Sequence, residues 1–181
     1  REAEAIAVSA RENATVVWLL GKVQSGKTSI VRALTGCTDA EIGPGYAPCT
    51  RTSRVFDFPP EAPVIRFLDT RGLGEARYDP TEDLAFAERQ AHLLLVVMRA
   101  LDPQQDAIVS IVRDLRTRRP AWPVIVAQTS LHDGYPPGAN HPPQYAFDSQ
   151  GLPTADVPAE LARSLAFQRS LFRDLPGTGL V

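Results

Sequence analysis

Three apolar stretches of the chain have the pattern of β-strands that are covered on both faces. They are TVVWLL (15–20), HLLLVVMRA (92–100) and PVIVAQT (123–129), and they lack the polar alternation of a half-exposed strand. Two further stretches, RVFDF (54–58) and VIRFLD (64–69), predict neighbouring strands joined by a short connection. The hydrophobic pattern therefore predicts a sheet whose central strands are buried.

Amphipathic segments separate these strands and predict helices. One helix follows the first strand and stops at Gly36, a second covers 83–91, and a last helix covers about 158–175. Strands that alternate with such helices are typical of a parallel sheet with helices on both faces. We therefore predict an α/β fold.

A further helix is marked by its first residues. Asp102 provides an N-cap, Pro103 occupies the first turn, and Gln105 completes a capping-box spacing. The apolar face that follows consists of Ile108, Ile111, Val112 and Leu115. The sequence thus predicts that this helix begins directly after Asp102.

The composition is that of one globular domain with no electrostatic reason to bind a polyanion. The chain has 181 residues, 44% hydrophobic and 22% charged, with a formal net charge of -2. This balance argues against binding of nucleic acid or anionic membranes by this segment. The longest strongly apolar run, 93–98, is too short to cross a bilayer.

The N-terminal segment has helical composition but no Met and no helix start signal. We expect residues 1–14 to be a helical extension cut from a longer polypeptide, and residues 15–181 to form the functional domain. Cys37 and Cys49 have no metal-ligand spacing and suggest a reduced, cytoplasmic setting. The parent polypeptide could still be membrane-associated through a segment outside this chain.

The most specific chemical signal is the spacing G-x-x-x-x-G-K-T between the first strand and the first helix. Gly21, Gly26, Lys27 and Thr28 fill its fixed positions. In this context backbone N–H groups converge on a phosphate, Lys27 reaches the β- and γ-phosphates, and the Thr28 hydroxyl ligates Mg²⁺. The other predicted nucleotide-binding residues of this stretch are Gln24, Ser25 and Ser29.

A carboxylate is also needed on the metal side of such a site, and D-x-x-G is the usual guide to it. The chain contains this pattern at 69–72, 148–151 and 174–177. Only Asp69 ends a buried strand downstream of the loop, which places its carboxylate at the C-terminal edge of the sheet. Asp69 is therefore the candidate Mg²⁺ residue, with the Gly72 amide near the γ-phosphate.

Three segments resemble, in order and spacing, the Era-like branch of translation-factor-class GTPases. They are GKVQSGKT (21–28), CTRTSRVFDF (49–58) and FLDTRGLGE (67–75), and PCTR within them resembles the YfjP-type bacterial members. The resemblance covers residues 15 to about 130. It implies a Ras-like P-loop G domain with a mostly parallel six-stranded sheet and helices on both faces.

The same resemblance assigns the switch threonine that meets Mg²⁺ and the γ-phosphate. Thr50 and Thr52 both qualify by position, and the resemblance points to Thr50, which precedes Arg51, with Thr52 as the alternative. The ligands implied are GTP or GDP and Mg²⁺, with Lys27, Thr50, Asp69 and Gly72 as the catalytic set. Members of the family switch between states through two loops, which here are 43–54 and 70–82.

The base-reading box departs from the family pattern. Relatives carry N-K-x-D or T-K-x-D after a buried strand, and the aspartate accepts two hydrogen bonds from guanine. Here Thr129 to Asp133 is one residue longer and has no lysine. In our interpretation Thr129 ties to the phosphate loop, Asp133 reads the base, and Leu131 or His132 covers the ring. The alternative is that Asp133 and Gly134 form only a turn.

The segment after this box is also shorter than in relatives. About 24 residues, rich in proline, separate Asp133 from Pro158. We expect one late helix to be lost or reduced to loop, YAFDSQ (145–150) to supply a short last strand, and Ser149 to stand near the base. His92, at the start of a buried strand, has a structural role in this interpretation.

The catalytic position predicts slow hydrolysis. Leu73 follows the D-x-x-G glycine, where Ras-like members have a glutamine that orients water. Gln24 replaces the asparagine that holds potassium in many Era-type proteins, while Arg51 and Arg71 are candidate positive charges in cis. We expect hydrolysis to be raised by an activating protein partner, by homodimerisation or by a missing domain.

Two other functions remain open. A P-loop ATPase or kinase is the first, but Thr70 stands where the ATPase branch needs a glutamate after Asp69. The second is a nucleotide-dependent binding or assembly module with negligible turnover, which Leu73 and the altered base box favour.

Overall fold

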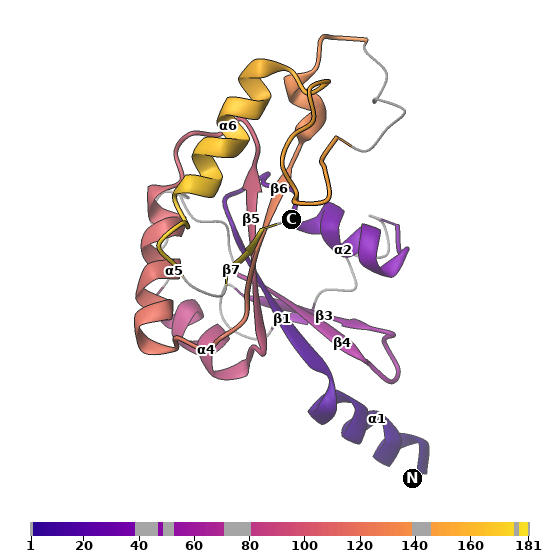
Figure 1. Cartoon of the computed structure of the whole chain (residues 1–181). Coiled ribbons are helices and arrows are strands. Elements are labelled where there is room, and N and C mark those ends of the chain that lie inside the picture. The colour runs from indigo at the N-terminus through magenta and orange to yellow at the C-terminus, as the bar shows by residue number, and fades with distance from the viewer. Residues whose placement is uncertain are drawn as a thin grey trace.

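The computed structural model describes residues 2–38, 47–48, 53–70, 81–138, 146–175 and 178–180. Within these residues seven strands form one sheet, in the order β2-β3-β4-β1-β5-β6-β7 (Figure 1). The strands are β1 Thr15–Gly21, β2 Ala47–Pro48, β3 Arg54–Phe58, β4 Ile65–Asp69, β5 Leu93–Arg99, β6 Val124–Thr129 and β7 Thr178–Leu180.

The strands from β4 to β7 in this order are parallel to one another. β1 pairs with β4 on one side and β5 on the other, β5 pairs with β6, and β6 with β7. β3 runs antiparallel to β4 and to β2. The carboxyl ends of β1, β4, β5 and β6 therefore lie at one edge of the sheet, where α/β proteins bind ligands.

Helices cover both faces of the sheet, as predicted. α4 (Thr81–Gln90) and α5 (Asp106–Arg118) lie on one face and α2 (Lys27–Thr35) on the other (Figure 1). α1 (Glu2–Asn13) extends from the start of β1, beyond the end of the sheet (Figure 1). No helix among the described residues has the length and hydropathy needed to cross a membrane.

Alternating residues of the central strands supply two cores, one on each face. Trp18 and Leu20 of β1 pack with the helices α4 and α5, while Val17 and Leu19 pack on the side of α2 against Val31. All of these side chains are buried, which explains why the strand sequences show no polar alternation.

α5 begins three residues later than the capping pattern predicts. Its N-cap position is Gln105, whose side chain makes no cap hydrogen bond, and its first helical residue is Asp106. The Asp102 carboxylate is engaged elsewhere, because Oδ1 accepts a hydrogen bond from the Gln104 amide and Oδ2 binds Lys22 Nζ. Asp102 thus closes a local turn and holds the phosphate loop instead of capping the helix.

α6 (Ala159–Ser170) is the crossover helix between β6 and β7. The last strand is therefore β7, and the prediction of a last strand at 145–150 is wrong for the described part of that segment, where Phe147 forms only an isolated bridge with Pro153. Between β6 and α6 the described residues contain the 3₁₀ helix η1 (Leu131–Gly134) and no α-helix.

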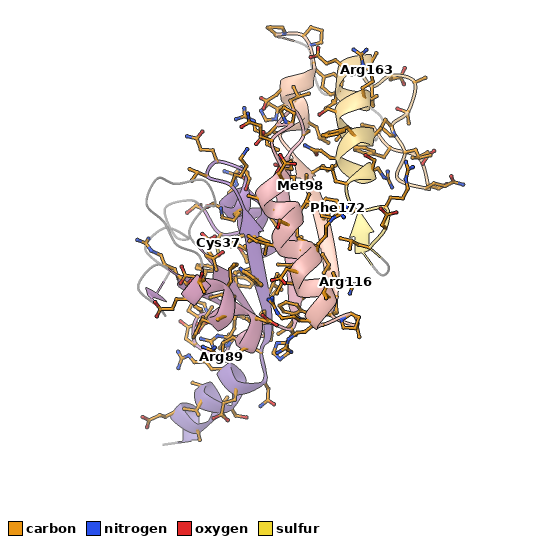
Figure 2. The ribbon with its side chains drawn as sticks, turned by 90° about the vertical axis from the view of Figure 1, so that its left-hand side faces the viewer. Cys37, Arg89, Met98, Arg116, Arg163 and Phe172 are labelled. Carbon is orange, nitrogen blue, oxygen red and sulfur yellow. The ribbon has the colours of Figure 1, made fainter. Side chains whose placement is uncertain are left out.

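A buried glutamine attaches α6 to the carboxyl edge of the sheet. Gln168 Nε2 donates to the backbone oxygens of Arg99 (2.8 Å) and Asp102 (3.1 Å), and Gln168 Oε1 accepts from Gln128 Nε2 (2.9 Å). Gln168 has no exposed surface. Just beyond the helix, Phe172 joins the core near Met98 (Figure 2).

We expect Gln168→Ala to lower the free energy of unfolding by about 2 kcal/mol, because it removes three buried hydrogen bonds, with Gln128, Arg99 and Asp102, and leaves a cavity in place of the side chain. Urea denaturation measures this change. Arg163→Ala, on the exposed side of the same helix (Figure 2), is the control and should change stability by less than about 0.5 kcal/mol. Equal effects of the two substitutions would contradict a structural role for Gln168.

Candidate nucleotide-binding site

The loop between β1 and α2 has a backbone that depends on two glycines. Gly26, which precedes α2, has φ 98°, and Gln24 also has a positive φ, 59°. A Cβ at Gly21 would lie 2.5 Å from Ser25 Oγ and 2.6 Å from the Val97 backbone oxygen. The loop can therefore close this tightly on the end of β5 only with glycine at position 21.

Lys27 is the first residue of α2 and folds back over this loop. Its Nζ donates to the backbone oxygens of Gly21 (3.2 Å) and Lys22 (3.1 Å). No side chain caps α2, and its first turn contains no acidic residue. The positive end of the helix dipole and the Lys27 ammonium therefore act together at the loop, as an anionic phosphate requires.

Asp69 ends β4 and carries a buried carboxyl group close to these charges. It pairs in register with Arg54 of β3 and Leu19 of β1. Burial raises the pKa of Asp69 from 3.8 to about 6, and the positive charges of Lys27 and Arg54 oppose part of this shift. Its Oδ1 is buried without a hydrogen-bond partner among the described residues.

This unpartnered oxygen fits a hard cation such as Mg²⁺, which binds oxygen ligands and is commonly held by one carboxylate together with substrate phosphates. The Thr28 hydroxyl, in the first turn of α2, is of the same ligand class. No group of three or more His, Cys, Asp or Glu residues in the described ranges could hold a metal alone. The residues present thus suit a metal that is shared between the protein and a bound phosphate.

Thr129, the last residue of β6, connects the sheet to the loop. Its hydroxyl donates to the Ser25 backbone oxygen, and the Met98 backbone oxygen lies 3.3 Å away as a second acceptor. A Cβ at Gly26 would lie 3.3 Å from the Thr129 side chain, so loop and strand are in close contact. This is the tie between Thr129 and the loop that the sequence analysis expects.

Asp133 lies in η1 and makes an ion pair that the sequence analysis missed. Arg99 Nε and Nη2 donate to Asp133 Oδ2 at 3.0 and 2.7 Å, and His132 Nε2 lies 3.2 Å from Oδ1. Arg99 ends β5, opposite Thr129 of β6 in register. A charged residue at the end of an otherwise apolar strand was the available signal, but only the strand order places it beside Asp133.

A pocket of about 480 Å³ opens beside the phosphate loop. It contains two ion pairs, Arg99 with Asp133 and Lys22 with Asp102 (2.5 Å). Its lining residues are Lys22, Val23, Gln24, Ser25, Val97, Arg99, Leu101, Asp102, Pro103, Gln105 and Asp133. The structure thus brings the loop and the candidate base reader to one cavity.

Other predicted residues lie apart or outside the described residues. Ser149 is exposed and does not line this pocket. His92 is structural, because its Nδ1 accepts a hydrogen bond from the Val16 amide at 2.9 Å. Six residues that the sequence analysis singles out in the two predicted switch loops lie outside the described ranges: Thr50, Arg51, Thr52, Arg71, Gly72 and Leu73.

Comparison with known families and structures identifies the family and the fold of the chain. The model of a family described as 50S ribosome-binding GTPase matches residues 16–128. No curated protein matches the chain. A solved structure of Toc33 from Arabidopsis thaliana, a dimerization-deficient mutant, is similar to it with 19% sequence identity and a TM-score of 0.51, over 95% of this chain and 66% of that one.

Two other similar structures have TM-scores of 0.48. One is the small COPII coat GTPase Sar1 from Encephalitozoon cuniculi in complex with GDP, with 15% identity over 75% of this chain and 58% of that one. The other is the bacterial selenocysteine-specific elongation factor EF-Sec, with 17% identity over 93% of this chain and 25% of that one. The chain therefore spans less than two thirds of each of these proteins. The predicted Ras-like G-domain fold is confirmed, and the described residues form seven strands where six were predicted.

The raised pKa of Asp69 predicts how stability varies with pH in the absence of nucleotide and metal. Between pH 3.8 and about 6 the folded protein binds this proton more tightly than the unfolded chain, so stability falls as the pH rises through this window. Asp69→Asn removes the effect. We expect the free energy of unfolding of wild type, relative to Asp69→Asn, to fall by about 2 kcal/mol from pH 4 to pH 7 in urea denaturation with EDTA. Parallel pH profiles of the two proteins would contradict the buried carboxyl group.

Proposed function

Because the chain belongs to the 50S ribosome-binding GTPase family, we propose that it binds GTP and GDP with Mg²⁺ and acts as a nucleotide-dependent switch with slow intrinsic hydrolysis. The observation that carries this proposal is the phosphate loop, with Lys27 folded over it and the unpartnered Asp69 oxygen nearby. In such a site the buried carboxyl group binds a metal ion, and the lysine and the tight glycine loop bind the phosphate that shares this metal.

The residues of this chain would divide the work between phosphate and metal. Lys27 and the loop amides stabilise negative charge on the phosphates, while Thr28 and Asp69 hold Mg²⁺. Thr50 is proposed as the switch threonine and Gly72 as the amide donor near the γ-phosphate. Bound Mg²⁺ would neutralise phosphate charge. It would also favour the ionised form of Asp69, which burial alone disfavours.

Asp133 is proposed to select guanine. An ionised carboxylate accepts hydrogen bonds on both oxygens, which matches the N1–H and N2–H donors of guanine and no pair of groups on adenine. The pocket shared by Asp133 and the loop supports this assignment.

The turnover and the biological setting are proposals drawn from the sequence. Leu73 cannot orient water as a glutamine does, so we propose that an activating protein or a second copy of the chain raises the rate. The PCTR segment supports a place in the Era-like branch. We propose that the domain works in the cytoplasm and that residues 1–14 are a helical extension in front of it.

Leu73 also favours a second candidate, a binding or assembly module that uses nucleotide without turning it over. Release of phosphate from GTP, with and without a partner, separates the two candidates. Absence of release over hours in every condition would favour the assembly module.

Lys27→Ala should reduce GDP affinity by about a hundredfold or more, because it removes the cation at the phosphates. Isothermal titration calorimetry with GDP and Mg²⁺ measures this loss. Arg119→Ala, which removes an arginine paired with Glu88 on α4, should leave GDP affinity unchanged. GDP affinity equal to wild type in the Lys27 variant would end the phosphate-loop assignment.

The second test addresses the base. Wild type should prefer GDP to ADP, and Asp133→Asn should lower GDP affinity by about tenfold or more while raising affinity for xanthosine diphosphate. The amide NH₂ of asparagine opposes the guanine N2 amine but donates to the O2 that xanthine has in its place. Equal binding of GDP and ADP by wild type would mean that Asp133 is only a turn residue.

A further inference from the structure

The Arg99–Asp133 pair places hydrogen-bond donors and acceptors side by side. Both Arg99 donors bind the same oxygen, Oδ2, so Oδ1 is not used by Arg99. A guanidinium carries five N–H donors in one plane, and three of those of Arg99 are not used in this pair. The pair therefore leaves Oδ1, which lies 3.2 Å from His132 Nε2, as the acceptor oxygen that Arg99 does not use, with further Arg99 donors next to it.

We propose that Arg99 is a second base-reading residue, which donates a hydrogen bond to O6 of guanine while Asp133 accepts from N1–H and N2–H. The inference rests on the proposed binding of guanine nucleotides at the loop. The edge of guanine that would face Asp133 carries the donors N2–H and N1–H and then the acceptor O6. The Asp133 carboxylate complements the two donors, and the Arg99 guanidinium complements O6. Arginine is the side chain that proteins use most often to donate to guanine O6 and N7.

The position of Arg99 supports this role. Its backbone is fixed at the carboxyl end of β5, because Gln168 Nε2 donates to its oxygen and because it pairs with Thr129, which binds the phosphate loop. Its guanidinium, 47% exposed, lines the same pocket as Asp133 and the loop. The reading groups are thus carried by the elements that also hold the loop.

Arg99 is also the positively charged residue that is available to donate to the base, because the base-reading box is altered. The stretch from Thr129 to Asp133 has no lysine. Two cationic residues line the pocket, and Lys22 is held by Asp102 Oδ2 (2.5 Å) and by the Gln104 backbone oxygen (2.8 Å). Arg99 contacts the candidate base-reading carboxylate directly.

This arrangement would reject adenine at two positions. Adenine has the N6 amine where guanine has O6, so that donor would oppose the Arg99 donors. Adenine N1 is an acceptor and would oppose the Asp133 carboxylate. Loss of Arg99 should therefore change the ratio of GDP to ADP affinity and not nucleotide affinity in general.

The first experiment compares Arg99→Ala with wild type by isothermal titration calorimetry with GDP and ADP in Mg²⁺. GDP affinity should fall about tenfold to a hundredfold, and ADP affinity should not fall. Arg118→Ala is the matched control, because Arg118 is 46% exposed, forms an ion pair of 2.8 Å with Glu88, and lies outside the pocket. Equal losses for both nucleotides, no change, or tighter GDP binding would each overturn the proposal; the last would show that Arg99 competes with the base.

A second experiment separates contact with the base from an effect through Asp133. Xanthine keeps O6, so in the Asp133→Asn background Arg99→Ala should still weaken xanthosine diphosphate binding by about tenfold. If Arg99 acts only by orienting the carboxylate, the substitution will have no effect in this background. Arg99→Lys, which keeps the charge but loses the planar fork, should bind GDP with intermediate affinity.

The two proposals fail in different ways. If wild type does not prefer GDP to ADP, the proposed function itself fails. If wild type prefers GDP and Arg99→Ala keeps the same preference, only the role of Arg99 is overturned.

Discussion

The close packing of the loop from Gly21 to Gly26 against the ends of β5 and β6 is the constraint on which the rest of the site depends. Gly21 lies against Val97, and Thr129 binds the Ser25 backbone oxygen, so the loop is held by two neighbouring parallel strands. This contact fixes where Lys27 begins α2. It also fixes the distance between the phosphate site and the side chains of Arg99 and Asp133, because Arg99 ends β5 and Asp133 follows β6.

The second feature of the site is the Asp69 carboxyl group, whose negative charge the neighbouring residues do not fully stabilise. A buried carboxyl group, Asp69, lies near Lys27 and Arg54, yet burial still dominates and raises its pKa. An additional cation would reverse that preference and add a partner for the unpartnered oxygen. Metal and phosphate therefore suit the site only together: the phosphate meets Lys27 and the metal meets Asp69.

α6 connects the base side of the site to the crossover between β6 and β7. Gln168 binds the backbone of both Arg99 and Asp102, the two residues whose side chains reach Asp133 and Lys22. One helix thus supports both ion pairs of the pocket.

The sequence by itself determined the buried strands, the α/β fold and the phosphate loop, because these follow from local patterns: apolar runs, helical periodicity and fixed glycine spacing. It also placed Asp69 and Thr129 at the ends of two strands that the pattern marks. The start of α5, the last strand β7 and the partner of Asp133 were decided only by the tertiary structure. Asp102 was taken for a cap because nothing local reveals Lys22, and Arg99 was overlooked because it lies 34 residues from Asp133 along the chain. Such contacts depend on which strands are neighbours, and strand order is a property of the whole sheet.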